Sequence, residues 1–391
     1  MININIFCIK AYATCSINVN GGLGEPQPLL IRPGTSNFYY PAGKDGIINL
    51  NENNQIEIFC TSGFATPSGL SNSATATCAS GNQFIVNNVR YSFNQFVCKN
   101  FVESTARKTG GRCYNNGYEV EIGFVVATRF LRTMTVCHDE TREETYYAKY
   151  SMTPANEGYQ TGYPRPNFVT GGFFGDKNVD GLYSRNTQRN TVATLLGSSA
   201  LAAKYIEETS DVFMARGHLA AKADFIFGSQ QKATFFFVNV APQWQKFNAI
   251  NWAAAEDASR HLAGNRNINL EVYTGTWGVT GLKDASNTFR DIYLYVSGTT
   301  RKIPVPKLYY KILLNKADNS GVVLIGVNNP HLTLDEIKKD YVICTDVSDK
   351  ITYVSWQKND ISRGFSYACD VNEFLKKVPH ISGVSTSKLL V

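Results

Sequence analysis

The segment from Asp211 to Leu262 has the clearest structural pattern in the sequence. It predicts a strand that ends at Arg216-Gly217-His218, then a loop, then an aromatic strand over Thr234 to Val240. Helical spacing follows over Asn251 to Leu262, where one face collects Trp252, Ala255, Ser259 and Leu262. Two strands and a helix bring one histidine, one arginine and several amides together, so we expect the functional site here.

Length and composition predict a folded protein of two domains. The chain has 391 residues, of which 43% are apolar and 12% aromatic, so it can bury at least one large core. Short apolar runs between Gly-, Asn- and Ser-rich turns predict a small β-rich domain over residues 16–110. The polar stretch Glu103 to Arg112 is predicted to be a linker or exposed loop, with the larger domain over residues 111–391. The small domain is interpreted as a structural cap, with substrate binding or inhibition as alternatives.

The charge balance and hydropathy of the chain give only weak information about what it binds. The 38 basic and 32 acidic residues give a net charge of +6, a weak bias toward polyanions. No apolar run approaches the length of a membrane span, so we expect no membrane partner.

The nine cysteines indicate disulfides rather than a metal site. The sequence has no Cys-x-x-Cys pair and no paired histidine spacing, which disfavours zinc and favours an oxidising compartment. We expect Cys344 to pair with Cys369, because these two lie apart from the others, and Cys8 to be the odd thiol. Residues 1–15 are interpreted as a possible leader remnant, although Lys10 interrupts their apolar run. The expected location is secreted, with mitochondria as the alternative.

Three linked motifs carry a resemblance to a known family: Arg216-Gly217-His218, Asn239-Val240-Ala241-Pro242-Gln243, and the spaced set Asn248, Trp252 and Glu256. In this order and spacing they resemble the DNA/RNA non-specific endonucleases of the ββα-metal superfamily, most closely the secreted nucleases and double-stranded ribonucleases of arthropods. One position departs from the pattern: Ala215 stands where many relatives carry Asp, which leaves a supporting carboxylate in question.

The resemblance implies both a fold and an activity. The fold is α+β: a ββα-metal nuclease core in a central antiparallel sheet flanked by helices, with the small disulfide-tied β domain before it. The activity is Mg²⁺-dependent hydrolysis, with Mn²⁺ as a possible substitute, of phosphodiester bonds in DNA and RNA, including double-stranded RNA, to 5′-phosphate ends. The implied partners are these nucleic acids alone, without an obligate protein partner. The alternative is a catalytically inactive relative that binds nucleic acid, for which Ala215 is the hint.

The resemblance also assigns roles. His218 is the general base, since imidazole titrates near neutral pH. Arg216 supplies a cation to the scissile phosphate, or alternatively pairs with Asp211 or Asp224. Asn248 is the metal ligand, because Mg²⁺ prefers oxygen ligands and is often held by few protein groups.

Further residues are implied with open alternatives. Asn239 orients the ligand shell or the base, or is only a turn residue at a strand end. Glu256 accepts a hydrogen bond from a metal-bound water, or is an ordinary helix carboxylate. An arginine upstream grips a phosphate, for which Arg185 and Arg189 are the candidates, each also explicable as a solvated charge at a helix start. Two lysines, Lys307 and Lys311, line the substrate groove or serve solubility.

Overall fold

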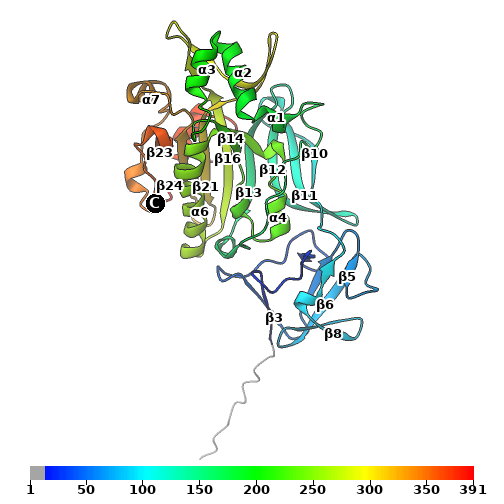
Figure 1. Cartoon of the computed structure of the whole chain (residues 1–391). Helices are drawn as coiled ribbons and strands as arrows, with labels where there is room; N and C mark the ends of the chain where they lie inside the picture. The colour runs from blue at the N-terminus through cyan, green and yellow to red at the C-terminus, as the bar shows by residue number, and fades with distance from the viewer. Residues whose placement is uncertain (1–13) are drawn as a thin grey trace, which may run out of the picture.

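The computed structural model describes residues 14–391, which form two β-rich parts, the smaller below the larger in the view of Figure 1. Most of the expected leader remnant, and Cys8, lie outside the described residues. The smaller part is built from the N-terminal residues, and the larger part holds a nine-stranded sheet with helices around it.

The N-terminal part is a set of short antiparallel strands tied by two disulfides. Cys15 pairs with Cys78, and Cys60 pairs with Cys98. A five-stranded sheet has the order β2 (Leu29–Ile31), β4 (Gln55–Phe59), β6 (Ser73–Ser80), β7 (Gln83–Val86) and β8 (Val89–Ser92). Two strand pairs complete it: β1 (Thr14–Asn18) with β3 (Ile47–Asn51), and β5 (Phe64–Thr66) with β9 (Val97–Cys98). The expected disulfide-tied β structure is confirmed.

The large sheet is the central antiparallel sheet that the resemblance implies. Its order is β10 (Thr105–Arg112), β11 (Tyr118–Val126), β12 (Arg129–Asp139), β13 (Glu144–Met152), β16 (Leu270–Val279), β21 (Pro306–Asn315), β22 (Ser320–Val327) and β23 (Ser366–Cys369). A last short strand, β24 (Lys388–Leu389), pairs with β22 in parallel. Two hairpins extend from it: β17 (Gly281–Lys283) with β18 (Phe289–Asp291), and β19 (Tyr293–Ser297) with β20 (Thr300–Pro304).

The segment expected as a linker, residues 103–112, is mostly the edge strand β10. Its backbone pairs with β11, with Thr105 opposite Gly123 and Lys108 opposite Val120. Nearly all of its side chains are exposed. An edge strand with charged, solvent-facing side chains has the same composition as a polar loop, so the linker prediction was wrong. The division of the chain into domains stays a prediction, and we propose that the boundary lies between β9 and β10 rather than at residue 110.

Helices cover the sheet, and the longest of them carries part of the site. They are α1 (Val179–Leu182), α2 (Arg185–Leu196), α3 (Ser199–Tyr205), α4 (Gly228–Lys232), α5 (Gln245–Phe247), α6 (Ala253–Arg266), α7 (Leu334–Asp340) and α8 (Val371–Lys377). In Figure 1, α6 runs along the face of the sheet over β21 and β16. Its buried face has small or apolar residues, which allow close approach to the sheet: Ala255, Ala258, Leu262 and Ala263.

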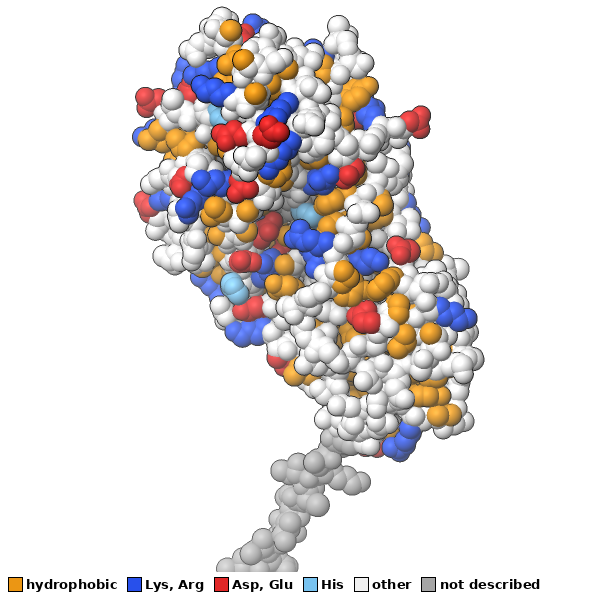
Figure 2. All heavy atoms as spheres, in the orientation of Figure 1, with side chains coloured by type: hydrophobic (Ala, Val, Ile, Leu, Met, Phe, Trp, Pro, Cys, Tyr) orange, Lys and Arg blue, Asp and Glu red, His pale blue; other side chains and the backbone are white. Residues whose placement is uncertain are grey.

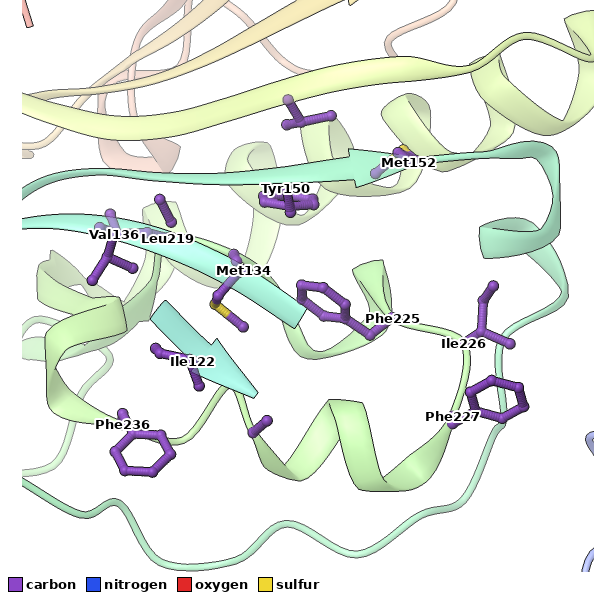
Figure 3. Close-up of a cluster of buried hydrophobic side chains, with 14 of the residues drawn as sticks. Ile122, Met134, Val136, Tyr150, Met152, Leu219, Phe225, Ile226, Phe227 and Phe236 are labelled. Atoms are coloured by element: carbon purple, nitrogen blue, oxygen red, sulfur yellow. The ribbon is translucent and has the colours of Figure 1, made fainter. Parts of the chain in front are cut away.

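Part of the core lies between the strands and the chain that follows β14 (Met214–His218), as Figure 3 shows. The strands contribute Ile122, Met134, Val136, Tyr150 and Met152, and the segment after β14 contributes Leu219, Phe225, Ile226, Phe227 and Phe236. Burying a large apolar side chain stabilises the fold by about 1.5–3 kcal/mol. The irregular segment beside the site is therefore fixed by its apolar side chains.

Two more disulfides lie in the larger part. Cys113 pairs with Cys137, and Cys344 pairs with Cys369 as expected. Among residues 14–391, no helix has both the length and the apolar character needed to cross a membrane.

Candidate active site

The segment around His218 folds as two strands and a helix. Strand β14 pairs antiparallel with β15 (Val240–Trp244), so that Gly217 lies opposite Ala241. After α5 the chain makes a single π-helical segment, η6 (Asn248–Trp252), and continues into α6. The strand expected over residues 234–240 was wrong, because the β14–β15 ladder begins only at Val240 and before it Phe236 makes no more than an isolated bridge to Val169. The phenylalanines before Val240 lie in an irregular segment and are buried. Their packing in the core, rather than strand pairing, accounts for their apolar character.

A cleft of about 530 Å³ opens where these elements meet. Four of the expected site residues line it: Arg216, His218, Asn248 and Glu256. Residues 159–162 and Arg165 form another part of its wall, and Lys222 also lines the cleft. Figure 2 shows this face hollowed, with a histidine and several basic side chains around the hollow.

His218 ends β14 and packs against two aromatic rings that also contact each other. Its imidazole lies 5.1 Å from the ring of Phe168 and 5.0 Å from that of Phe235, centre to centre. Burial, with smaller contributions from Arg165 and Lys222, lowers the pKa of His218 to about 3. The ring is therefore neutral at physiological pH, which is the form that can accept a proton.

Asn248 begins the π-helical segment with a free carboxamide. No other described residue hydrogen-bonds its side chain, although it lines the cleft. Asn251, one turn on, is the opposite case: its amide donates to the Gly364 carbonyl at 2.8 Å and its oxygen accepts from the Gln357 N–H at 2.9 Å. Single π-helical turns inside helices are frequent at functional sites. Asn248 is thus the amide of this turn that is available to a ligand.

Glu256 projects from α6 into the same cleft, two helical turns beyond Asn248. Burial, and next the nearby carboxylate of Asp224, raise the pKa of Glu256 to about 7 against the opposing charges of Lys311 and Arg260. The carboxyl group can therefore change its charge near neutral pH.

The match to known proteins agrees with this geometry. The family model for DNA/RNA non-specific endonucleases matches residues 110–374, which is more than half of the chain and includes every cleft residue named above. The chain belongs to this family. It is accordingly a nuclease, an enzyme that hydrolyses phosphodiester bonds.

Relatives extend the match beyond that region. The chain is similar to a salivary endonuclease of Lutzomyia longipalpis, with 26% identity over 90% of this chain and 80% of the relative. It is similar to the salivary protein Tsal1 of Glossina morsitans morsitans, with 21% identity over 96% of this chain and 95% of the relative. A nuclease of Syncephalastrum racemosum is 33% identical over 31% of this chain and 39% of the relative.

Arg216 of this endonuclease pairs with neither acid suggested by the sequence. Its guanidinium lies 2.7 Å from Oδ1 of Asp180, in α1, and donates to the Asp180 carbonyl at 3.1 Å. Asp180, which lies outside the motif, therefore supplies a carboxylate to Arg216. Ala215, which stands where many relatives carry Asp, has no carboxylate to offer. The other suggested acid, Asp224, is buried and bound to Arg260 and Lys311.

Asn239 does not reach the cleft, so its expected place at the catalytic centre is corrected. The side chain is fully buried, its oxygen accepts from the Ala220 N–H at 2.9 Å, and its amide donates to the Ala220 and Thr234 carbonyls at 2.9 and 3.0 Å. All of these partners are backbone groups, and Ala220 is two residues beyond His218. Asn239 thus fixes the chain that follows the histidine, without touching the cleft.

The structure does not bring Arg185 and Arg189 to the cleft. Arg185 donates to the carbonyls of Glu207 and Ser210 at 2.8 and 2.6 Å, and Arg189 donates to the Ile206 carbonyl at 2.7 Å. Both side chains hold the loop after α3 onto α2, through Nη1 of Arg185 and Nε of Arg189. The proposed phosphate contacts are therefore corrected for both residues.

Arg165 and Lys222 are the basic cleft residues that sequence reasoning missed. Lys222 donates to the Tyr163 carbonyl at 2.7 Å, and Arg165 lines the cleft with an exposed side chain. A signal was present, because Arg165 stands between Pro164 and Pro166 in a loop with no other charge nearby. Proline on each side restricts the backbone and presents such an arginine outward.

The two groove lysines are also corrected. Lys311 is fully buried, and its Nζ atom donates to Tyr150, Thr274 and Asp224 beneath the site. Lys307 lies over the ring of Tyr341, 5.1 Å from its centre, and does not line the cleft.

Proposed function

We propose that this endonuclease hydrolyses DNA and RNA, including double-stranded RNA, with His218 as general base and a divalent cation, Mg²⁺ or Mn²⁺, held through Asn248. One observation carries the proposal: a neutral imidazole and an unpartnered amide face one cleft from adjoining elements of a strand–strand–helix unit. Hydrolysis needs a proton acceptor for water and positive charge near the phosphate, and these groups supply the first and a place for the second.

The residues present fit a hard cation. Asn248 offers a neutral oxygen with no competing partner among the described residues, and the carboxyl group of Glu256 lies in the same cleft. Residues 14–391 contain no group of three His, Cys, Asp or Glu side chains that could hold a metal, which disfavours a caged ion. Mg²⁺ is often bound through one or two protein ligands with several waters and phosphate oxygens. When bound, such an ion supplies charge to the phosphate and its departing oxygen.

The protein groups account for the remaining steps. His218 accepts the proton of the attacking water, while Arg216 and Arg165 offset the charge that grows on the phosphate oxygens. Glu256, in its ionised form, orients water beside Asn248 by accepting a hydrogen bond. The ring contacts of Phe168 and Phe235 keep the imidazole in one orientation throughout.

The cleft favours contacts to phosphate over contacts to bases. Its charged groups are three cations and one carboxyl group: Arg165, Arg216, Lys222 and Glu256. Phosphate contacts carry no sequence information, so cleavage should be insensitive to sequence. The steps above need no ribose 2′-hydroxyl, which supports action on both DNA and RNA.

We further propose that the enzyme is exported. The described residues contain four disulfides, and disulfides form and persist in oxidising compartments such as the extracellular space. Two of the similar proteins are named as salivary. Mitochondria stay the alternative location.

The test is cleavage of plasmid DNA and of long double-stranded RNA, with Mg²⁺ or with EDTA. His218→Ala and Asn248→Ala should each lower cleavage by at least about 100-fold, the range typical for loss of a general base or of a group that stabilises developing charge. Exposed residues provide the matched controls, His261→Ala and Asn54→Ala, which should cleave normally. A wild-type protein that retards both nucleic acids yet leaves them intact with Mg²⁺ and Mn²⁺ would establish the inactive, binding alternative instead.

A further inference from the structure

One wall of the cleft is a short irregular stretch, residues 159–165, that follows η3 (Pro154–Gly158). Lys222 of the nuclease part donates to the Tyr163 carbonyl of this stretch at 2.7 Å, and Gln160 ties the backbone further: its N–H donates to the Ile226 carbonyl, and its carbonyl accepts from Gln231, each at 2.8 Å. The residues on either side of it, Tyr159 and Thr161, are held differently.

Asn20, in the turn after β1, bonds both neighbours of Gln160. Its amide donates to the Tyr159 carbonyl at 3.2 Å, and its oxygen accepts from the Thr161 N–H at 2.8 Å and from the Thr161 hydroxyl at 3.2 Å. The side chain of Asn20 therefore binds the backbone of the cleft wall as both a donor and an acceptor, as a paired strand would.

The same region of the N-terminal part contacts the wall at two more places. The side-chain amide of Gln27 donates to the side-chain oxygen of Gln160 at 3.0 Å. The backbones at Gly46 and Gly158 touch, because a Cβ atom placed on Gly158 would lie 2.6 Å from the Gly46 nitrogen. The N-terminal part thus supports the first residues of the wall, from Tyr159 to Thr161, and the end of η3 just before them.

This part is poorly suited to binding nucleic acid by itself. Residues 14–98 carry three basic and four acidic side chains, so they offer phosphates no net attraction. We therefore expect the N-terminal part to affect substrate binding indirectly, by holding the cleft wall that carries Arg165.

We infer that Asn20 is a positioning residue for substrate binding, through which the N-terminal part fixes the cleft wall that carries Arg165. The inference rests on the proposed function of the cleft. His218, Asn248 and Glu256 stand on other elements, so loosening the wall should weaken substrate binding and leave the chemical step intact.

The test is a double-mutant cycle in the full chain, with Asn20→Ala, Arg165→Ala and both together, measured on one double-stranded DNA. Asn20→Ala should raise KM about three- to tenfold, the equivalent of one or two neutral hydrogen bonds, with kcat within about twofold. The double variant should have the KM of Arg165→Ala alone, because both changes act through one group. Asn54→Ala, an exposed asparagine of the same part with no side-chain bond, should match wild type.

Two results would overturn the inference: an unchanged KM in Asn20→Ala, or additive effects in the double variant. A fall in kcat together with a lowered Tm would also overturn it, because that pattern marks general destabilisation. Fluorescence anisotropy of the same DNA in EDTA gives Kd for each variant. If wild type binds this DNA but does not cut it when Mg²⁺ or Mn²⁺ is added, the proposed function fails, while the pattern of Kd values still decides the role of Asn20.

Discussion

The Nζ atom of Lys311 lies 2.9 Å from Oδ2 of Asp224, and neither side chain is exposed to solvent. Arg260 binds the other oxygen of Asp224 at 2.7 Å. Burial alone would raise the pKa of Asp224, but Lys311 and Arg260 hold it below its usual value. The pair joins the sheet, through β21, to the residues that border the cleft beside Lys222.

Removing the cation of this pair should be costly. Lys311→Met should lower the free energy of unfolding by about 3 kcal/mol or more, because it takes one of two counter-charges from a buried carboxylate. Urea denaturation measures this. The control is Lys316→Met, in which an exposed lysine loses a 2.9 Å bridge to Glu271 and the expected cost is below about 1 kcal/mol. Equal losses of unfolding free energy in the two variants would show that the buried pair stabilises the fold no more than the exposed one.

The pH dependence of cleavage should report Glu256 rather than His218. The pKa of His218 is lowered to about 3, so the imidazole is already neutral throughout the range from pH 5 to pH 9. The pKa of Glu256 is raised to about 7, so this group gains its negative charge as the pH rises through neutrality. If the ionised carboxylate is the active form, kcat/KM should rise with pH and level off above about pH 8.

The variant Glu256→Gln separates the two assignments. It should show low activity without the rise near pH 7, because glutamine does not titrate. The measurement is kcat/KM between pH 5 and pH 9 at one fixed metal concentration. If the rise persists unchanged in Glu256→Gln, another group controls it.

Asn239 and Asn248 should differ in what their loss affects. Asn239→Ala leaves three buried backbone groups without partners, so we expect a loss of about 3 kcal/mol in unfolding free energy together with reduced cleavage. Asn248→Ala removes no internal hydrogen bond, so stability should stay within about 0.5 kcal/mol while cleavage is lost. Thermal unfolding and cleavage assays on both variants measure the contrast. A stable, fully active Asn239→Ala would contradict its positioning role.

The motif around His218 could be predicted because its information is local. The order and spacing of Arg216, His218 and Asn248 can be read from one short segment without knowledge of the rest of the chain. The structure brings all three residues to one cleft. The pairing of Cys344 with Cys369 was predictable for a similar reason, since only these two cysteines lie in the C-terminal region.

The errors come from tertiary contacts that no local pattern records. Arg185 at a helix start is indistinguishable in sequence from a phosphate ligand, until the loop after α3 folds back and supplies carbonyls to it. Lys311 follows strand spacing that a surface lysine would also follow, and only its pairing with Asp224 allows it to be buried. Arg165 lines the same cleft as Arg216 and His218, which lie more than fifty positions away in the sequence, so no local motif could include it.

Gly217 should be irreplaceable because β14 and β15 leave no room for a side chain. A Cβ atom at this position would lie 2.4 Å from Oε1 and 2.6 Å from Cβ of Gln243, and 2.6 Å from the hydroxyl of Tyr309. Both neighbours are fully buried, so Gly217→Ala must displace the strand that carries Arg216 and His218. A displacement of about 1 Å can lower the rate by about 100-fold, and overpacking should cost about 1–3 kcal/mol of stability. The control is Gly43→Ala, where no heavy atom lies within 4 Å and both activity and Tm should be unchanged. Wild-type kcat in Gly217→Ala would mean that catalysis tolerates movement of β14, against the geometry proposed for His218.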